Sequence, residues 1–318
     1  MEALVWLGGD QLEVQDVPEP ENQPGKIVVD VTVAAVCGSD LHAYRGHGGK
    51  RRPPLVLGHE AVVSLPGSDR HFAVLPLTSC GACPSCRSGR ENLCPERVLL
   101  GLDVPGTFAA KVAVSEEALF EMPGALTPEL AVLVEPLATA VQALGDVPSG
   151  SEVVVLGCGT IGLLTAFAAA SQGAVVTAVD PLAARRTAAG DLGASVLLAS
   201  VDELAASFAA RCVDAVGIES TWRAGLRVLR PGGSITVVGL GQADGTIPIG
   251  DIVRGGLTVT GSYAYTRRDF EAARDLLAAG GLGTGWLTSM PLAEGRRAFA
   301  SLVEQPDRFL KVLLRPAG

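Results

Sequence analysis

The stretch from residue 152 to residue 180 constrains the fold of this chain more than any other. Its first part, residues 153–156, is a short apolar and β-branched run that predicts a buried parallel strand. A run of small residues at 160–171 predicts a helix, and residues 174–179 predict a second buried strand that ends at Asp180. The stretch therefore predicts a compact strand, helix and strand unit.

Three glycines with the spacing G-x-G-x-x-G stand between the first strand and the helix. The first allows a tight turn, the second lets the backbone approach a pyrophosphate, and the third lets the helix pack closely on the strand. Asp180 follows the last glycine by 18 residues, about where an acid that binds a ribose is expected. These features predict a nicotinamide dinucleotide site, and the alternative is an ordinary βαβ unit with a glycine-rich turn. The candidate cofactor-binding residues are Gly157, Gly159, Thr160, Ile161, Gly162, Asp180 and Arg185.

Asp180 also predicts which dinucleotide binds. A carboxylate accepts hydrogen bonds from ribose hydroxyls, and it repels a 2′-phosphate. Residues 181–183 hold no arginine that could bind this phosphate. Arg185 and Arg186 fall on the next predicted helix, where a solvent-exposed face is the simpler interpretation. The sequence therefore favours NAD over NADP.

The size and charge of the chain narrow the class of protein. Its 318 residues suggest two domains, and its net charge of −9 argues against a nucleic-acid or anionic-membrane partner. No apolar run of about 18 residues lacks a charge or a break. The N-terminus shows no basic region followed by an apolar core. We therefore expect a cytoplasmic protein without a membrane span or a signal peptide.

Four of the seven cysteines fall within one short segment, residues 80–94. In a reducing compartment such a cluster indicates a metal site before a disulfide framework. Four thiolates can close a tetrahedral shell without an open position, which is typical of structural zinc. An iron–sulfur cluster and free thiols are the alternatives. The predicted zinc ligands are Cys80, Cys83, Cys86 and Cys94.

A second set of polar residues lies among apolar segments. Cys37 and His59 are both suitable zinc ligands, and a catalytic zinc needs three protein ligands and an open position. Either residue alone would more often be a core cysteine or a histidine bonded to the backbone. Glu135 lies in a mostly apolar predicted helix, residues 128–144, where an unpaired carboxylate would be costly. A metal is one partner for it, and an arginine or a backbone group in a helix kinked at Pro136 is the other.

Strands and helices continue to alternate after the dinucleotide unit. About six strands result, which is enough for a full doubly wound parallel sheet. The N-terminal strands predicted at 3–7 and 26–36 do not fit this alternation and indicate a separate, mostly β domain. The other expected elements are strands at 196–198, 214–217, 234–238, 257–261 and 309–314, helices at 201–210, 221–229 and 269–279, and a turn at 230–233.

These motifs together resemble the zinc-dependent medium-chain dehydrogenase/reductase family, in its alcohol and polyol dehydrogenase members. The matching segments are V-C-G-S-D-L-H at 36–42, L-G-H-E at 57–60, C-x2-C-x2-C-x7-C at 80–94, V-E-P-L-A at 134–138, G-x-G-x-x-G at 157–162 and R-P-G-G at 230–233. The resemblance implies an α/β fold with two domains. One is a GroES-like, mostly β catalytic domain, formed by 1–136 together with 267–318, and the other is a Rossmann doubly wound parallel sheet at 137–266. A glutamate at position 135 resembles the polyol, sugar and threonine dehydrogenase branch.

The resemblance also implies roles for individual residues. Cys37, His59, Glu60 and Glu135 match the catalytic-zinc positions of the family. Glu60 and Glu135 are expected to alternate with water as ligands. Asp40 matches a carboxylate that orients the zinc-binding histidine.

The remaining implied roles concern proton transfer, cofactor and partners. Ser39 and His42 match a relay that carries the proton of the alcohol toward solvent, while a hydride goes to the nicotinamide. Capping of a helix is a compatible role for Ser39 and Asp40. Lys311 matches a basic position near the cofactor pyrophosphate, and a surface lysine is an equal alternative. We expect two Zn²⁺ ions per chain, NAD, a secondary alcohol or its ketone (polyol, sugar, cyclitol or amino-alcohol), and a homodimer or homotetramer.

Two other functions are compatible with the sequence. One is a zinc-free reductase of activated double bonds on the same fold, and the other is a non-catalytic dinucleotide-binding protein. Metal content and alcohol-dependent NADH formation separate them. The segments 60–80 and 198–221 are shorter than the family pattern. The candidate residues of the substrate pocket are Tyr44, His47, Phe108, Tyr263 and Tyr265.

Overall fold

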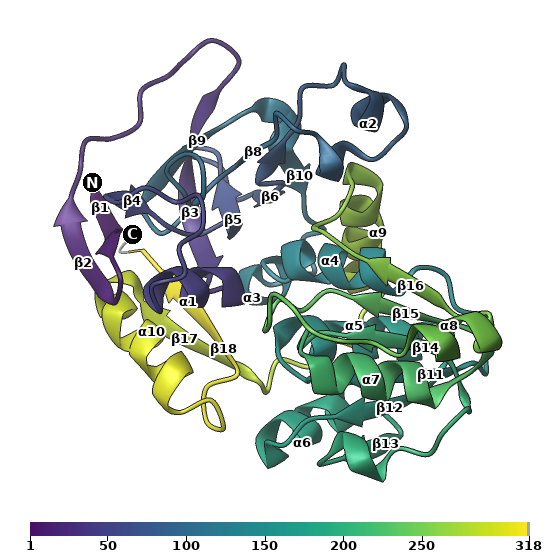
Figure 1. Cartoon of the computed structure of the whole chain (residues 1–318). Helices are drawn as coiled ribbons and strands as arrows, with labels where there is room; N and C mark the ends of the chain where they lie inside the picture. The colour runs from purple at the N-terminus through teal and green to yellow at the C-terminus, as the bar shows by residue number, and fades with distance from the viewer. Residues whose placement is uncertain (317–318) are drawn as a thin grey trace. The chain divides into compact units, whose positions relative to one another are not determined.

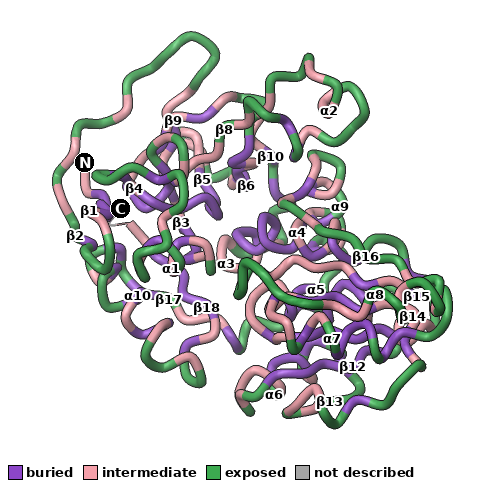
Figure 2. The backbone as a smooth tube through the Cα atoms, viewed as in Figure 1, coloured by how far each residue is buried: buried purple, intermediate pink, exposed green. Residues whose placement is uncertain are grey.

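The computed structural model describes residues 1–316, in which two compact units can be distinguished (Figure 1). The first unit holds Met1–Glu135, Thr266–Gly280 and the chain from Trp286 onward. The second unit holds Pro136–Tyr265 and Gly281–Gly285. Each unit has a buried core of its own (Figure 2).

A seven-stranded sheet forms the centre of the first unit. Its strands are β3 (Ile27–Ala35), β5 (Glu60–Ser64), β6 (His71–Val74), β9 (Lys111–Val114), β10 (Leu119–Glu121), β17 (Leu287–Pro291) and β18 (Lys311–Arg315). Neighbouring strands follow the order β10-β6-β5-β3-β18-β17, and β9 pairs with β3 as well. Because β18 pairs antiparallel with β3, both ends of the described chain build this unit.

Two smaller sheets and several short helices complete the first unit. One sheet joins β1 (Glu2–Gly8) to β2 (Gln11–Asp16) and β4 (Leu55–Val56), and the other joins β7 (Leu77–Thr78) to β8 (Val98–Leu99). The helices are α1 (Gly38–Tyr44), α2 (Pro84–Arg87), α3 (Pro128–Ala131), α9 (Arg267–Ala278) and α10 (Gly295–Glu304), with 3-10 turns η1 (Glu91–Leu93), η2 (Glu116–Ala118) and η4 (Leu292–Glu294). In the core, Phe108 meets Phe299 edge-on, with ring centroids 6.0 Å apart.

The single helix predicted at 128–144 is two helices in the structure. The chain leaves α3 after Ala131 and enters α4 (Val134–Leu144), so the break falls at 132–133 and not at Pro136. Pro136 lies in the first turn of α4, where its missing N–H removes no helical hydrogen bond. Glu135 therefore lies at the start of a helix, where the helix dipole favours a negative charge.

The second unit is built on a six-stranded parallel sheet, as predicted. Its strands are β11 (Glu152–Leu156), β12 (Val175–Val179), β13 (Val196–Leu198), β14 (Ala209–Asp214), β15 (Leu229–Val237) and β16 (Thr258–Gly261), and its helices besides α4 are α5 (Thr160–Ser171), α6 (Ala183–Asp191), α7 (Glu219–Val228) and α8 (Ile249–Gly255). The order β13-β12-β11-β14-β15-β16 reverses between β11 and β14, which is the arrangement of a dinucleotide-binding doubly wound sheet. The central strands are buried nearly throughout (Figure 2), because helices cover a parallel sheet.

Two segments of the second unit differ from the prediction. Residues 201–210 form only the 3-10 turn η3 (Val201–Glu203) before β14 begins, so the predicted helix at 201–210 and strand at 214–217 are wrong. Small apolar residues suit a helix locally, but here β14 fills the place between β11 and β15, and Ser207 turns the chain with a left-handed φ of 56°. The turn predicted at 230–233 lies inside β15, where the register with β14 shifts.

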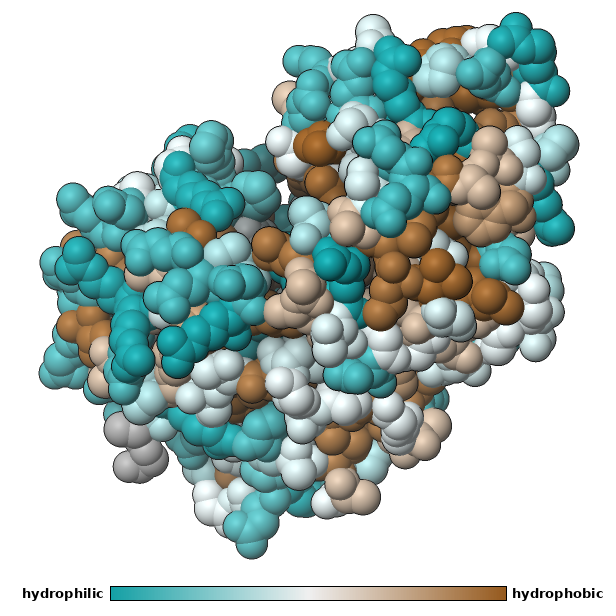
Figure 3. Space-filling model, turned by 90° about the horizontal axis from the view of Figure 1, so that it is seen from below, coloured by the Kyte–Doolittle hydropathy of each residue, from teal (hydrophilic) through white to brown (hydrophobic). Residues whose placement is uncertain are grey.

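The described surface carries apolar as well as hydrophilic side chains. Figure 3 shows one face, on which brown hydrophobic areas lie between hydrophilic side chains. Val175 on β12 and Val196 on β13 are examples of large apolar side chains that reach solvent. Across residues 1–316, no helix has both the length and the apolar character needed to cross a membrane.

Candidate metal centres and cofactor site

Cys37 lies between the end of β3 and the start of α1, where it is the N-cap residue. Its backbone N–H donates to Asp40 Oδ2 at 3.1 Å, and the carboxylate of Asp40 is fully buried. An acidic side chain that accepts from the N-cap N–H fixes the first turn of a helix. The local sequence therefore holds the Cys37 side chain at a defined place beside the sheet.

His59 and Glu60 follow a glycine that the fold requires. Gly58 has a left-handed φ of 94°, and a Cβ atom on it would lie 2.6 Å from a ring of the core. Gly101 and Gly106 pack against it so closely that a Cβ atom on them would lie 2.5 Å and 2.2 Å from the Gly58 carbonyl oxygen. We call these three residues the glycine stack. The stack holds the backbone at the start of β5, where His59 precedes the strand and Glu60 is its first residue.

The structure brings Cys37, His59 and Glu60 together in the first unit. One ligand atom from each lies within 4.8 Å of the others, and His59 and Glu60 are buried. Zinc bonds of about 2.0–2.3 Å to nitrogen, oxygen and sulfur fit between atoms at this spacing. Among residues 1–316, Glu60 Oε1 is a buried polar atom without a hydrogen-bond partner, which is costly unless a ligand satisfies it. These donors therefore fit a bound zinc ion.

Negative charges around His59 favour a cation at the Cys37–His59–Glu60 site. Burial lowers the pKa of His59, but the charges of Asp40, Cys37 and Glu135 outweigh burial and raise this pKa to about 10. Asp40 Oδ1 lies 3.8 Å from His59 Nδ1. A zinc ion, which binds the neutral imidazole, would take the place of that proton. Glu135 lies outside the group of three and acts on His59 through its charge.

Lys311 is a buried residue, so its interpretation as a surface lysine is wrong. Its side chain is 1% exposed, and its ammonium group donates to Glu60 Oε2 at 2.5 Å and to the Val36 carbonyl oxygen at 3.0 Å. The pairing of β18 with β3 places Lys311 near the end of β3, just before Cys37. One oxygen of Glu60 is thus held by a lysine, which leaves Oε1 for a cation.

Ser39 and His42 lie one turn apart on α1. Ser39 is half-buried, and His42 is exposed enough to meet solvent. Partial burial, followed by nearby positive charges that include Arg51, lowers the pKa of His42, so its imidazole is neutral near pH 7. Sequence reasoning missed Arg51, whose buried guanidinium donates to Ser39 Oγ at 3.2 Å. The basic run 50–52 resembles an ordinary solvated loop, and no other signal in the sequence marked this residue.

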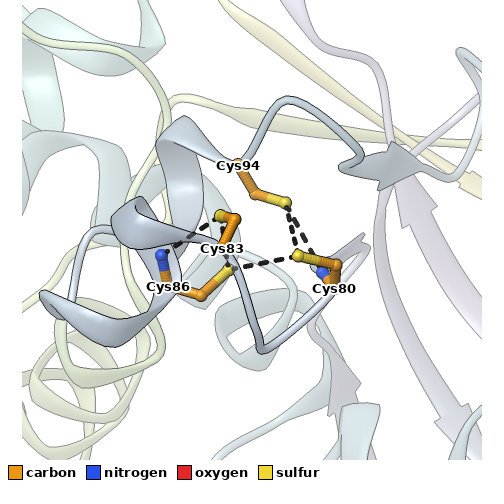
Figure 4. A group of neighbouring side chains, drawn as sticks. All are labelled: Cys80, Cys83, Cys86 and Cys94. Carbon is orange, nitrogen blue, oxygen red and sulfur yellow. Dashed lines mark hydrogen bonds between the residues drawn. The ribbon is translucent and has the colours of Figure 1, made fainter.

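The four cysteines of residues 80–94 form one cluster in the first unit (Figure 4). The Sγ atoms of Cys83 and Cys86 are 3.5 Å apart, those of Cys80 and Cys94 are 3.5 Å apart, and 4.0 Å separates Cys80 from Cys86. Sulfur atoms around a tetrahedral zinc lie about 3.8 Å apart when each bond is about 2.3 Å. Cys83 is the N-cap of α2 and accepts from the Cys86 N–H at 3.5 Å, so this short helix sets two of the ligands. The cluster fits a structural zinc.

Cys80 already has the character of a metal ligand. Hydrogen bonds from the backbone N–H groups of Ala82 and Cys83 lower the pKa of Cys80 to about 7, and the side chain of Cys94 contributes. A thiol with this pKa is partly thiolate near neutral pH, and the thiolate is the form that binds zinc. All seven cysteines are free thiols in the described chain, so none of the four cysteines in the cluster forms a disulfide.

The glycine-rich turn connects β11 to α5 in the second unit, as predicted. A Cβ atom on Gly162 would lie 1.7 Å from the carbonyl oxygen of Gly157, so only glycine allows this helix to pack so closely. Gly159 is the N-cap of α5, and the space beside its Cα is open. Thr160 and Ile161 begin the helix, whose N-terminal N–H groups suit a pyrophosphate.

Asp180 follows β12 with its carboxylate buried. Its Oδ2 accepts from the backbone N–H of Cys158 at 2.8 Å, and its Oδ1 accepts from that of Leu182 at 2.9 Å. The second bond closes an Asx turn around Pro181, which keeps the carboxylate at the end of the strand. Arg185 Nη1 lies 3.7 Å from Asp180 Oδ2, so the interpretation of Arg185 as part of a solvent-exposed face is wrong. The first turn of α6 carries Arg185 back to the strand end.

Packing accounts for two of the predicted pocket residues. Phe108 is fully buried beneath Gly58 and edge-on to Phe299, which makes it a core residue. Tyr44 packs on the same Phe299 ring, with centroids 5.5 Å apart. Tyr263 is 42% exposed in the second unit. The aromatic residues therefore do not mark a substrate pocket by themselves.

Comparisons with known proteins agree with this geometry. Residues 23–124 match the family model of the alcohol dehydrogenase GroES-like domain, and residues 160–279 match that of the zinc-binding dehydrogenases. The chain is 32% identical over 310 residues to D-xylulose reductase A of Aspergillus oryzae, covering 87% of this chain and 86% of that protein. The structure of 2R,3R-butanediol dehydrogenase from Bacillus subtilis matches with a TM-score of 0.89 and 27% identity over 99% of both chains. L-idonate 5-dehydrogenase from Escherichia coli matches with a TM-score of 0.90 and 25% identity, covering 99% of this chain and 97% of that one.

The fold and the two matched domain models define the class of this protein as a zinc-binding dehydrogenase. The identity to a curated relative extends over most of both chains, and it shows the family as well. The chain belongs to the zinc-dependent medium-chain polyol dehydrogenases. The family and the fold class expected from the motifs are thus confirmed.

Proposed function

We propose that this enzyme transfers a hydride between a secondary alcohol of a polyol or sugar and NAD. The observation that carries the proposal is the Cys37–His59–Glu60 site, in which His59 and Glu60 are buried. This site shares one unit with Ser39 and His42. The names of the relatives support this substrate class, since they refer to D-xylulose, 2R,3R-butanediol and L-idonate. Each of these compounds carries a secondary alcohol or a ketone beside a hydroxyl-bearing carbon.

An assay with probes taken from those names tests the proposal. Purified protein should form NADH from NAD and 2R,3R-butanediol, or consume NADH with D-xylulose, while it holds about two zinc ions per chain. Zinc-loaded protein that turns over neither probe would count against the proposal. Zinc-free protein that reduces an activated double bond instead would favour the reductase alternative.

The two donor sets are proposed to hold one zinc ion each. The four cysteines of residues 80–94 hold the structural ion, and their need for reduced thiols supports the cytoplasm as the proposed compartment. Cys37, His59 and Glu60 hold the other ion, with Glu135 as an alternative ligand to Glu60. Zinc at that site supplies a Lewis acid that polarises the substrate oxygen and lowers the pKa of the alcohol. Lys311 holds the second oxygen of Glu60 and so keeps this carboxylate in position.

Ser39 and His42 carry the proton in the proposed mechanism. The Ser39 hydroxyl can accept the proton of the alcohol while it passes on its own. The imidazole of His42 is neutral near pH 7 and exposed, so it can receive a proton and release it to water. Asp40 lies beside His59 Nδ1 and orients that ring. The hydride step itself belongs to the nicotinamide, and the turn at 157–162 binds its pyrophosphate.

NAD is the proposed cofactor because the carboxylate of Asp180 can accept hydrogen bonds from the ribose hydroxyls. Two backbone N–H groups hold its carboxylate and leave a lone pair on each oxygen for the ribose hydroxyls. Arg185 partly offsets the repulsion that a 2′-phosphate would meet. We therefore expect a preference for NAD of about tenfold in kcat/KM, or about 1.4 kcal/mol, together with some use of NADP.

Replacing Asp180 with serine should raise kcat/KM with NADP relative to NAD by about a hundredfold. The change removes the repulsion and releases Arg185 to bind the 2′-phosphate. Steady-state kinetics with both cofactors measure this ratio. The matched control combines Asp180→Ser with Arg185→Met, and it should lose the gain with NADP. An unchanged ratio in Asp180→Ser would mean that this carboxylate does not face the ribose.

A second copy of the chain is the proposed partner at the open edge of the Rossmann sheet. β16 is the last strand of that sheet, and all four of its residues are exposed. Val259 on β16 is 43% exposed, and Ile249 and Val253 on α8 are 61% and 74% exposed. An open apolar edge invites aggregation unless it is paired. Two copies related by a two-fold axis would pair the same edge in both and cover it.

Light scattering at micromolar concentration should therefore give at least the mass of a dimer. Val259→Lys places a charge on the unpaired strand, so this variant should shift the protein toward the monomer. Val175→Lys, an exposed valine on the interior strand β12, is the matched control and should leave the mass unchanged. A monomeric unmodified protein would refute the proposed assembly.

A further inference from the structure

Arg51 is a buried arginine of the first unit that the mechanism above does not use. It lies in the connection between α1 and β4, and its side chain is 5% exposed. Its Nε donates to the carbonyl oxygen of Gly101 at 3.0 Å, and its Nη2 donates to Ser39 Oγ at 3.2 Å. The same Nη2 lies 3.5 Å from Asp40 Oδ1. One side chain thus links the glycine stack to the first turn of α1.

Burial of Arg51 has a cost that its contacts must offset. A guanidinium stays protonated in proteins, and an unpaired charge is expensive to bury. The flanking residues Lys50 and Arg52 are exposed, so the chain turns one of three consecutive basic side chains inward. Asp40 supplies the opposite charge. The Nη2 atom that faces Asp40 also reaches Ser39 Oγ, so the buried positive charge lies beside the serine hydroxyl.

The contact with Arg51 sets the direction of the Ser39 hydroxyl. A guanidinium only donates hydrogen bonds, so Ser39 Oγ must be the acceptor. One lone pair of this oxygen is then occupied, and its hydrogen points away from Arg51. The other lone pair is left to receive a proton. A nearby positive charge also stabilises the negative charge that the oxygen gains while a proton passes through it.

We propose that Arg51 is a positioning residue for proton transfer, which orients the Ser39 hydroxyl and stabilises the charge that develops on it. The inference rests on the proposed function, since Ser39 has this task only in an alcohol dehydrogenase. In the step, the O–H bond of the alcohol breaks, its proton moves to Ser39 Oγ, and the former Ser39 proton moves to His42 or water, while the hydride reduces NAD. Burial lowers the pKa of His42 most, followed by the charges of Arg45, His47 and Arg51. The lowered pKa keeps this proton acceptor neutral.

Two substitutions at position 51 separate the charge from the packing. Arg51→Gln keeps a hydrogen-bond donor without the charge, and Arg51→Lys keeps the charge on a single nitrogen without the planar fork. With 2R,3R-butanediol and NAD, we expect kcat to fall about 30-fold in Arg51→Gln and less than about fivefold in Arg51→Lys. The KM for NAD and the zinc content should stay within about twofold of the parent, and the solvent deuterium isotope effect on kcat should increase in both variants. Arg52→Gln, on the exposed neighbour, is the matched control and should change none of these.

A double-mutant cycle with Ser39→Ala tests whether Arg51 acts through Ser39. In the Ser39→Ala background, Arg51→Gln should lower kcat by less than about threefold, because the group it positions is already absent. A further loss of about 30-fold in that background would place the action of Arg51 elsewhere and overturn the inference. Equal kcat values for Arg51→Gln and Arg51→Lys, or loss of zinc from Arg51→Gln, would also overturn it, because each indicates a packing role.

The remaining outcomes distinguish a failure of this inference from a failure of the proposed function. If Arg51→Gln does not fold, Arg51→Lys still decides, because one ammonium group cannot hold Ser39 and Gly101 as the planar fork does. An isotope effect in Arg51→Lys identical to that of the parent would then overturn the inference. A parent protein that turns over neither probe overturns the proposed function. If the unmodified protein is active and Arg51→Gln has the same kcat, this inference is overturned and the proposed function stands.

Discussion

Replacing Cys37 with serine is expected to lower kcat for alcohol oxidation at least about a thousandfold. Cys37 is the one thiol of the Cys37–His59–Glu60 site, and a serine hydroxyl does not ionise to replace a thiolate ligand at neutral pH. The fold should survive, because Cys37 is the N-cap of α1 and serine is a favoured residue at that position. NAD binding should also survive, since its candidate residues lie in the second unit.

Metal analysis and kinetics on the same sample check this prediction. Zinc content should fall from about two ions per chain to about one, with the cluster at residues 80–94 as the internal control. Cofactor fluorescence should show unchanged NADH binding. Near-normal kcat in a sample that has lost one zinc ion would mean that the metal at this site does not take part in the chemistry.

Replacing Cys83 with serine should instead damage stability. Cys83 is both a predicted zinc ligand and the cap of α2, and binding of a structural zinc adds directly to folding free energy. We expect the melting temperature to drop by about 10 °C or more, or the soluble yield to collapse. The molecules that remain folded should hold about one zinc ion and keep most of their activity per active site.

Ser85→Ala is the matched control, because Ser85 lies in α2, next to Cys86, and is not a ligand. Its melting temperature should stay within about 2 °C of the unmodified protein. Differential scanning calorimetry with parallel zinc determination separates the two variants. A Cys83→Ser protein that keeps its melting temperature and both metal ions would show that the cysteines do not form a zinc site.

The local sequence was sufficient to predict the structure of short segments whose conformation depends on neighbouring residues. The glycines at 157, 159 and 162 lie within six residues, so their spacing alone predicted the turn, the helix start and the close packing seen in the structure. The four cysteines cluster for the same reason, since they come from residues 80–94. By contrast, the segment 201–210 became a turn and a strand because β14 pairs with β11 and β15, which a local helical pattern does not encode.

Contacts between distant residues explain what was missed in the candidate sites. Lys311 and Glu60 are 251 residues apart in sequence, and only the pairing of β18 with β3 brings the lysine under the metal site. Arg185 is close to Asp180 in sequence, but its approach depends on the turn that Pro181 and Leu182 make. Arg51 was hidden because a basic run gives no sign of which side chain turns inward.

The glycine stack limits how enzymes with this architecture can diverge. Behind His59, a Cβ atom on Gly101 or Gly106 would collide with main-chain atoms, which cannot rotate away. A Cβ atom on Gly58 would collide with the side chains of Phe108 and Thr107, and Gly58 also needs a left-handed backbone. One side of the metal site is therefore closed to amino-acid change. The segment 45–50 after α1 is largely exposed and already bends through left-handed Gly46 and Gly49. Natural variation in this enzyme should accumulate in such exposed segments, while the backbone behind the histidine keeps one shape.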